Sequence, residues 1–270
     1  MIDKSRLKKS FNRSASTYDK YAKIQTAVSA ELVSIVSKLR IIPNKALDIG
    51  SGTGTIALHI SRLFPRAGIF GCDIALAMAK RAGEKSREAG ARNLHFAVAD
   101  GGSLPFRDRQ FDLTVSSLTY QWVDDLPGAL REVSRILKPR GHFACTLLGK
   151  ETMFELKSSY RNAQREAGNG RPPHFHEFAE AGSILPMLEQ SGFTNIHITK
   201  SIKKEYHPDI KSIFSTLKAI GAQNVSREAP KGLGRKELFH WLARFYEENF
   251  RNLSGLPLTY EIYYVIAQKG

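Results

Sequence analysis

Short apolar runs and helical stretches alternate between Ala46 and Phe143, and this alternation is the feature that most restricts the fold. Five runs have the length and the β-branched or aromatic content of strands, at 45–50, 68–74, 94–100, 111–118 and 141–148. Three stretches between them have helical spacing, at 55–64, 76–90 and 126–141. Such alternation predicts an α/β fold in which helices cover both faces of a parallel, doubly wound sheet.

A glycine-rich segment, ALDIGSGTG, joins the first predicted strand to the first predicted helix. Gly50, Gly52 and Gly54 allow backbone N–H groups and a helix N-terminus to approach a ligand closely. A dinucleotide fingerprint would place its third glycine one position later, at Thr55, so the spacing argues against a pyrophosphate. Asp48, just before the turn, would repel a phosphate and attract an ammonium group.

Two further aspartates end the next two predicted strands. Asp73 is placed to accept hydrogen bonds from both hydroxyls of a ribose, and Asp100 from an adenine amino group. Each aspartate taken singly is more typical of a helix cap or a turn, and only their combination favours a ligand site. An ammonium group, a ribose and an adenine together describe S-adenosylmethionine.

These residues lie in LDIGSGTG, CDIALAM and ADGGSLPF, and the three segments in this order resemble the class I methyltransferase family. The resemblance implies a Rossmann-like, mostly parallel seven-stranded sheet and S-adenosylmethionine as cofactor. Arg13 is expected to pair with the carboxylate of that cofactor, with a solvated surface arginine as the alternative. The cofactor-binding residues implied are Arg13, Asp48, Gly50, Ser51, Gly52, Gly54, Asp73, Ile74, Met78, Asp100, Gly101 and Ser117.

Segments outside this core are similar to the malonyl-acyl carrier protein O-methyltransferases of biotin synthesis. They are FNRSASTYDKYAKIQ (11–25), SSLTYQWVDDL (116–126), STLKAIGAQNV (215–225), GLGRKEL (232–238) and LPLTYEIYYVIAQ (256–268). The similarity runs nearly end to end and is weakest over 150–200. It implies methyl transfer to the free carboxylate of a malonyl thioester, carried by an acyl carrier protein or by coenzyme A.

The expected chemistry needs no general base, because a carboxylate is already ionised at neutral pH. A dry aromatic pocket favours such a reaction, in which charges of both signs disappear in the transition state. If 17–37 is one helix, Tyr18, Tyr21 and Gln25 share a face that could close over the cofactor. Tyr120 and Trp122 could complete the pocket wall, although aromatic residues at such positions are also common in the core.

Amide and indole N–H groups are suited to holding the substrate carboxylate without neutralising it. The candidates are Gln25, Gln121 and Trp122, which with Tyr18 form the predicted catalytic set. The motif His174-x-His176-Glu177 does not predict zinc, because a catalytic zinc needs at least three protein ligands and no matching cluster occurs elsewhere.

The chain is predicted to have four parts: a helical cap over the cofactor site (1–40), the Rossmann-like core (41–207), a basic helical lid (208–256) and the last strand (257–270). Its net charge of +14 indicates an anionic partner. The positive charge concentrates in residues 3–13 and 200–236, and the second segment is the predicted docking surface for an acidic carrier protein.

Other functions compete with this one. A methyltransferase acting on another small acid or a quinone precursor would have the same sheet, and a non-catalytic assembly factor is a third class. An RNA methyltransferase fits the charge, but the chain has neither an Asn/Asp-Pro-Pro-aromatic segment nor a Pro-Cys pair. No nucleic-acid or membrane partner is expected. Without a signal peptide or a membrane span, a cytoplasmic protein with reduced Cys72 and Cys145 is expected.

Overall fold

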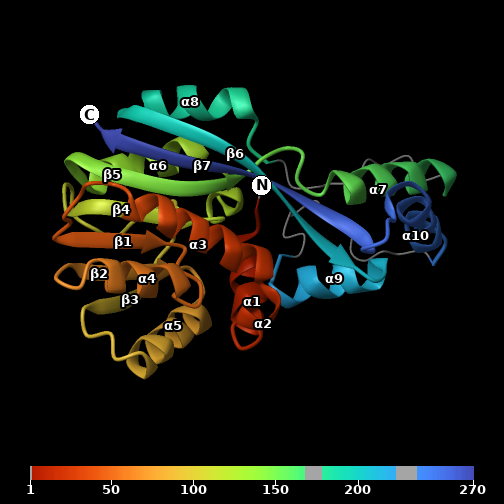
Figure 1. Ribbon diagram of the computed structural model, residues 1–270, viewed down its shortest axis with the longest axis horizontal. Coiled ribbons are helices and arrows are strands. Elements are labelled where there is room, and N and C mark those ends of the chain that lie inside the picture. Colours follow the sequence, from red (N-terminus) through yellow and green to blue (C-terminus); the bar gives the residue numbers. More distant parts are fainter. Residues whose placement is uncertain (1, 168–177, 223–235) are drawn as a thin grey trace.

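The computed structural model describes residues 2–167, 178–222 and 236–270. Its centre is a seven-stranded sheet in the order β3-β2-β1-β4-β5-β7-β6 (Figure 1). The strands are β1 (Lys45–Ile49), β2 (Gly68–Asp73), β3 (Leu94–Val98), β4 (Phe111–Ser117), β5 (Leu137–Leu148), β6 (Phe193–His207) and β7 (Leu256–Lys269). Only β7 runs antiparallel to its neighbours. The predicted doubly wound, mostly parallel seven-stranded sheet is therefore confirmed.

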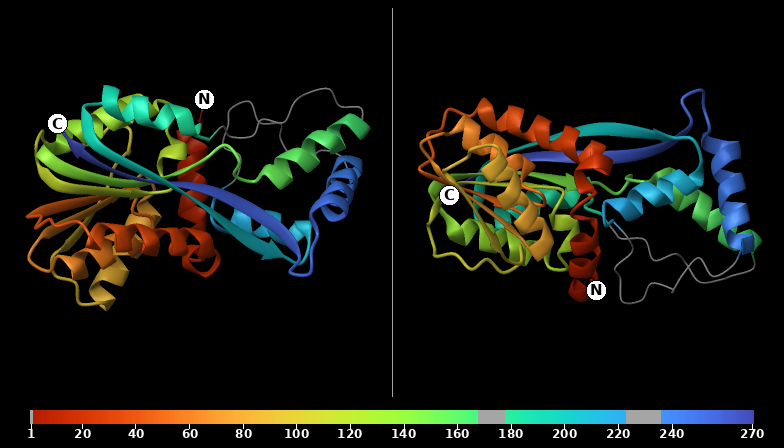
Figure 2. Two further views of the ribbon diagram at one scale, coloured as in Figure 1. Left: turned by 45° about the horizontal axis from the view of Figure 1, so that its top comes forward. Right: turned by 90° about the horizontal axis from the view of Figure 1, so that it is seen from below.

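Helices cover both faces of this sheet (Figures 1 and 2). The described helices are α1 (Lys4–Ser14), α2 (Tyr18–Tyr21), α3 (Lys23–Ser37), α4 (Thr55–Leu63), α5 (Leu76–Glu88), α6 (Leu126–Ile136), α7 (Phe154–Glu166), α8 (Ala181–Gln190), α9 (Ile210–Ala219) and α10 (Lys236–Phe250), with a single 3-10 turn at Tyr120–Trp122. Among these helices none combines the length and the apolarity that crossing a bilayer requires.

Two apolar cores lie on opposite faces of the sheet. Successive strand residues point to opposite faces, so Ala46 packs in the core shared with α3 and α4, and Leu47 in the core shared with α6 and α8. Cys72 and Cys145 are free thiols buried in β2 and β5. The sheet thus holds the carboxyl ends of β1, β2 and β4 rigidly at one edge.

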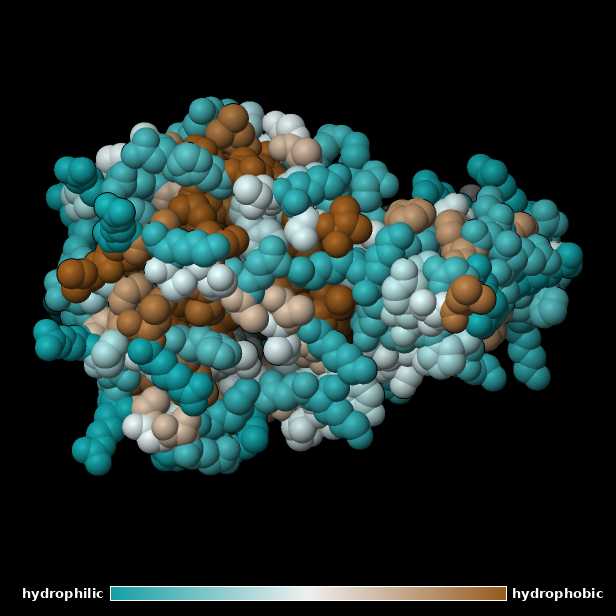
Figure 3. All heavy atoms as spheres, viewed as in Figure 1, coloured by the Kyte–Doolittle hydropathy of each residue, from teal (hydrophilic) through white to brown (hydrophobic). Residues whose placement is uncertain are grey.

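The two longest strands form an arm that leaves the main body. β6 and β7 stay paired from Phe193 and Lys269 to His207 and Leu256, with an irregularity near Asn195, and α7, α9 and α10 lie beside their far ends (Figure 2). Hydrophilic residues cover most of the arm, whereas apolar residues gather over the main body (Figure 3). α7 packs against α10 and β7, although its sequence lies within the predicted core segment 41–207. The four-part division remains a prediction.

Two element boundaries differ from the sequence-based prediction. The helix expected over 17–37 is broken at Ala22, whose ψ of 47° lies outside the helical region, so Tyr18 and Gln25 belong to different helices. The helix expected over 126–141 ends at Ile136, and β5 begins at Leu137. Pro139 explains this early end, since it lacks an amide N–H and disfavours the helical conformation at the residue before it.

Candidate active site

The glycine turn follows β1 and leads into α4. Gly50, Gly52 and Gly54 have φ values of 70°, 53° and 81°, which favour glycine because a side chain is strained there. The backbone N–H groups of Gly50 and Ser51 both donate to the carbonyl of Cys72, at 2.8 and 2.9 Å. The turn is therefore anchored to the end of the neighbouring strand β2.

The three glycines are required for different reasons. A Cβ at Gly50 would lie 2.2 Å from Thr119 Oγ1, and one at Gly54 would lie 2.8 Å from the Cβ of Ala82. A Cβ at Gly52 would meet no heavy atom within 4 Å. Gly52 thus has open space beside its Cα, where a ligand can approach, whereas the other two glycines permit close packing of the protein itself.

Asp48 lies beneath this turn and is 1 % exposed. Its Oδ2 accepts a hydrogen bond from the N–H of Ala57 at 3.0 Å, which satisfies one of the free donors in the first turn of α4. Its Oδ1 has no partner among the described residues. Burial, aided by the nearby charge of Asp73, raises the pKa of Asp48 to about 7 although the Ala57 bond opposes it. A cationic ligand at Oδ1 would reverse this effect.

Asp73, at the end of β2, is bound to the glycine turn. Its Oδ2 accepts from Gly52 N–H at 2.9 Å, and its Oδ1 accepts from Ala75 N–H at 2.8 Å. Burial raises the pKa of Asp73 despite these two hydrogen bonds. Tyr18 of α2 lies nearby, and burial, with the charges of Asp73 and Asp19, raises the pKa of its hydroxyl well above the ordinary value. Tyr18 is therefore a neutral hydrogen-bond donor at physiological pH.

Asp100 pairs with Lys4 of α1, a contact that the sequence did not predict. Lys4 Nζ lies 2.5 Å from its Oδ2, and Gly102 N–H donates to its Oδ1 at 3.0 Å. Burial would raise the pKa of Asp100, but these bonds outweigh burial and hold the pKa below its usual range. A Cβ at the adjacent Gly101 would lie 3.2 Å from Cγ2 of Ile49, at the end of β1. The end of β3 and the glycine turn therefore share one edge of the sheet.

The remaining predicted cofactor residues occupy varied environments. Met78 is 1 % exposed and packs with Ala15, Ala75 and Tyr18, and Ile74 is half-buried just after β2. The Ser117 hydroxyl lies 3.0 Å from Thr146 Oγ1. Arg13 is exposed in the last turn of α1 and has no ion-pair partner among the residues that the structure describes. Its role toward the cofactor stays a prediction.

The predicted catalytic residues do not form one continuous helical face. Gln25 is half-buried on α3, beyond the break at Ala22. Gln121 donates from Nε2 to the carbonyl of Leu118 at 2.5 Å, and its Oε1 is buried without a partner in the described part of the chain. One amide hydrogen of Gln121 is therefore already engaged, which leaves a single hydrogen for a substrate.

Two aromatic residues of the 3-10 turn have separate environments. Trp122 packs edge-to-face against Phe11 of α1, with ring centroids 5.7 Å apart. Tyr120 is 2 % exposed and packs against Phe143 in the core between the sheet and α6. Its hydroxyl is buried without a partner in the described chain, and its place in the pocket wall stays a prediction.

Several neighbours of the site were not found from the sequence. Thr53, within the glycine turn, donates to Asp19 of α2 at 2.5 Å, and Lys85 of α5 lies 2.8 Å from the same carboxylate. No periodic pattern signals these contacts, which join residues far apart in the chain. In the described ranges no group of three His, Cys, Asp or Glu residues is arranged to hold a metal ion. His174, His176 and Glu177 lie outside those ranges.

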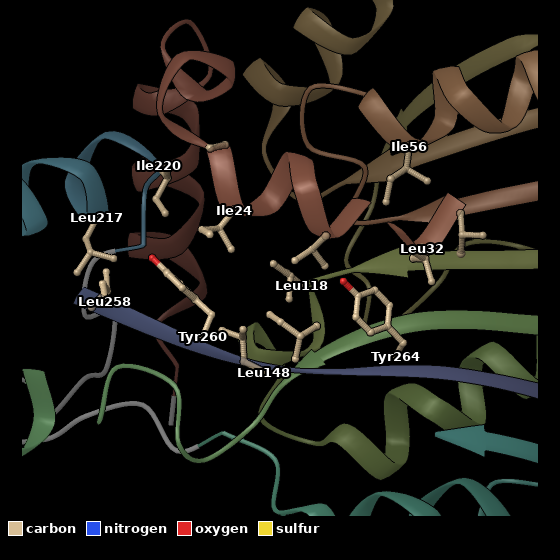
Figure 4. Close-up of a cluster of buried hydrophobic side chains, with 14 of the residues drawn as sticks. Ile24, Leu32, Ile56, Leu118, Leu148, Leu217, Ile220, Leu258, Tyr260 and Tyr264 are labelled. Atoms are coloured by element: carbon tan, nitrogen blue, oxygen red, sulfur yellow. The ribbon is translucent and has the colours of Figure 1, made fainter. Parts of the chain in front are cut away.

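The arm reaches this site through the end of α9. Leu217 and Ile220 pack with Tyr260 of β7, near Ile24 of α3 and Leu148 at the end of β5 (Figure 4). Ser10 of α1 also donates to the carbonyl of Gly221 at 3.0 Å. The arm, the N-terminal helices and the sheet edge therefore meet beside the glycine turn.

This arrangement fits an adenosyl cofactor with a cationic amino group. Asp48 Oδ1 and Ser51 Oγ are buried polar atoms without partners in the described chain, and Gly52 has open space before it. Asp73 presents a carboxylate beside that space. The chemistry of these donors and acceptors matches an ammonium group and ribose hydroxyls better than a pyrophosphate.

The fold and site define a class I methyltransferase. A family model described as a methyltransferase domain matches residues 47–145, which contain the glycine turn and β1 to β5 up to Cys145. The chain also resembles, in fold, YcgJ protein from Bacillus, with 18 % identity, a TM-score of 0.62 and coverage of 89 % of this chain and 98 % of that one. The cofactor of this class is S-adenosylmethionine.

Relatives extend the likeness to both ends of the chain. A malonyl-[acyl-carrier protein] O-methyltransferase from Geobacter sulfurreducens is 35 % identical over 100 % of both chains. One from Brevibacillus brevis is 32 % identical over 98 % of this chain and 96 % of its own. The bifunctional biotin biosynthesis protein BioHC of Saccharophagus degradans is 33 % identical over 96 % of this chain and 46 % of its own. The chain belongs to the malonyl-[acyl-carrier protein] O-methyltransferase family.

Proposed function

We propose that this protein transfers a methyl group from S-adenosylmethionine to the free carboxylate of a malonyl thioester carried by an acyl carrier protein, and so supplies a methyl ester for biotin synthesis. The observation that carries the proposal is the 35 % identity over the whole chain to a relative with this named activity. The methyltransferase domain match ends at residue 145. The identity therefore includes the arm and the N-terminal helices, which are the parts that could distinguish substrates.

The reaction needs little from the protein beyond binding and orientation. When bound, S-adenosylmethionine supplies an electrophilic methyl group on a sulfonium sulfur. A lone pair of the substrate carboxylate forms the new O–C bond while the C–S bond breaks and its electron pair stays on sulfur. No proton moves, because the carboxylate is ionised and the ester product needs none. The proposed step therefore requires no general base from the protein.

The residues of the site have matching tasks in this proposal. Asp48 attracts the cofactor ammonium group, and Asp73 accepts from its ribose. Gln25 and Trp122 orient the substrate carboxylate through N–H donors, which bind it without protonating it. Leu118 and Leu148 belong to one buried apolar cluster (Figure 4). In this proposal the cluster keeps water away from the methyl group. Exclusion of water strengthens each of these electrostatic contacts.

An acyl carrier protein is proposed as the carrier because the chain has a net charge of +14 and such partners are acidic. Four of the lysines in the described part of the docking surface that is proposed over 200–236 bear on this proposal. Lys200 pairs with Glu261 at 2.5 Å and Lys203 with Glu31 at 2.7 Å, so both lysines already have an anionic partner within the chain. Lys204 and Lys211 are exposed and have no ion-pair partner among the described residues. Residues 223–235 lie outside those described.

The proposal is tested by comparing malonyl and acetyl thioesters of the same carrier in single turnovers with labelled cofactor. The malonyl form should accept label as an ester that mild alkali releases, and the acetyl form should accept none because it has no free carboxylate. At saturating cofactor, the transfer rate should be flat from about pH 6 to 8. Equal labelling of both thioesters, or label that resists alkali, would contradict carboxylate methylation.

A further inference from the structure

Three residues from separate elements meet on the outer side of the glycine turn. Asp19 belongs to α2, Thr53 lies between Gly52 and Gly54, and Lys85 belongs to α5. Thr53 Oγ1 donates to Asp19 Oδ1 at 2.5 Å, and Lys85 Nζ donates to Asp19 Oδ2 at 2.8 Å. These contacts tie the N-terminal segment to the segment that faces the cofactor.

All three N–H donors of Lys85 are used within this cluster. Lys85 has three N–H donors, and the other two reach Thr53 Oγ1 and Thr55 Oγ1, each at 3.2 Å. Thr53 is 2 % exposed and uses its hydroxyl both as acceptor and as donor. The lysine side chain is 20 % exposed, against 46 % for the aspartate. The bonds that Thr53 makes to Asp19 and Lys85 are charge-assisted and partly buried, so they are stronger than those of a solvated surface pair.

The cluster supports a helix that has little stability of its own. α2 is four residues long and has no side-chain cap at its N-terminus. It nevertheless places Tyr18 against Ala75 and Met78, with the hydroxyl near Asp73. A helix of one turn is not stable in isolation, so its position depends on such tertiary contacts.

We infer that Asp19, Thr53 and Lys85 are positioning residues that hold α1 and α2 closed over the cofactor site and thereby set the rate at which S-adenosylhomocysteine leaves. α1 shares this closure, since Asn12 Oδ1 accepts from Ala77 N–H at 2.8 Å. The expected effect on turnover rests on the proposed function. The release rate does not depend on it, because release of bound S-adenosylhomocysteine is measured without any methyl acceptor.

The fluorescence of Trp122 can be used to follow this closure. Trp122 contacts Phe11 of α1, and the second tryptophan, Trp241, lies on α10. Changing Trp241→Phe leaves Trp122 as the sole tryptophan, whose fluorescence senses movement of α1 away from the sheet. Trypsin provides a second measure, because Arg13, Lys20 and Lys23 are exposed cleavage sites within the segment.

In this background, the variants Asp19→Asn and Lys85→Met should each release S-adenosylhomocysteine about threefold to tenfold faster in stopped flow. Trypsin should cleave the ligand-free variants faster by a similar factor. The variant Lys85→Arg should release S-adenosylhomocysteine more slowly than Lys85→Met, since arginine keeps the charge and several donors. The matched control is Arg81→Met, which removes an exposed ion pair with Glu84 on the same helix and should leave release unchanged.

Release as slow in Asp19→Asn and Lys85→Met as in the parent would overturn the inference, as would equal acceleration by Arg81→Met. A uniform loss of thermal stability without faster release would identify the cluster as merely structural, which also overturns it. If the variants release the nucleoside faster but the parent methylates no malonyl thioester, the proposed function fails and the positioning role stands. If the parent methylates the thioester and release is unchanged in the variants, the proposed function stands and the positioning role fails.

Discussion

Asp48 should destabilise the ligand-free protein at neutral pH, and replacing it should show this directly. The change Asp48→Asn keeps an oxygen that can accept from Ala57 N–H but removes the buried negative charge. We expect the variant to be more stable than the parent at pH 8 and to bind S-adenosylhomocysteine more weakly. Greater stability combined with weaker binding is typical of a charge kept for function.

The magnitude follows from the pKa of the buried carboxyl group. An acid whose pKa rises from 3.8 to about 7 on folding loses stability as the pH rises from about 4 to 7, on the order of 4 kcal/mol in total. Asparagine avoids that loss but places an amide donor where Oδ1 has no partner, which costs about 1–3 kcal/mol. The net gain should be about 1–3 kcal/mol at pH 8 and should vanish or reverse near pH 4.5.

Urea unfolding of parent and variant at the two pH values gives the difference in free energy of unfolding. Calorimetry gives the matching effect on ligand binding. Because the ammonium group prefers ionised Asp48, the affinity of the parent for S-adenosylhomocysteine should rise roughly eightfold between pH 6 and 7.5. Binding should release a proton in this range. The variant Asp48→Asn lacks this titration, so its affinity should show no such rise.

Two results would refute this reasoning. If Asp48→Asn is destabilised equally at pH 8 and pH 4.5, the carboxyl group is not penalised by burial in the free protein. If the two proteins bind S-adenosylhomocysteine with the same pH dependence, Asp48 does not face the ammonium group.

Three further predictions concern the other parts of the site. Asp73→Ala should weaken S-adenosylhomocysteine binding about tenfold to a hundredfold in calorimetry, since a charged acceptor is lost, and unchanged affinity would remove Asp73 from the ribose site. Gln25→Ala and Trp122→Phe should each slow single-turnover transfer about tenfold to a hundredfold with cofactor affinity nearly intact, and wild-type rates in both would exclude them from carboxylate binding. Changing Lys204 and Lys211 to Glu should raise KM for malonyl carrier protein about threefold to tenfold with a smaller effect on malonyl-coenzyme A, whereas equal effects on both would argue against carrier docking there.

The sheet and the cofactor edge could be predicted because their signals are local. Each strand is a short apolar run, and the three glycines, Asp48 and Asp73 lie at recognisable positions in the strand–turn–helix order. Only the boundaries were misjudged where the signal was ambiguous: the residues around Pro139 are typical of a turn, yet they continue as β5.

The contacts around the site could not be predicted because they depend on tertiary packing. Nothing local to Ala22 signals the break between α2 and α3, and nothing local to Tyr120 signals that its ring packs against Phe143. The pair of Lys4 and Asp100 joins residues that are 96 positions apart in the sequence. Such long-range pairs leave no periodic pattern, so the structure was needed to find them.

The most direct test of the central claim is to offer the purified protein labelled S-adenosylmethionine with a panel of acceptors. The panel contains malonyl carrier protein, malonyl-coenzyme A, free dicarboxylic acids and total RNA. The account predicts label on the malonyl thioesters, with the highest kcat/KM for the carrier-bound form. Label on RNA or on a free acid alone, with none on either malonyl thioester, would contradict it.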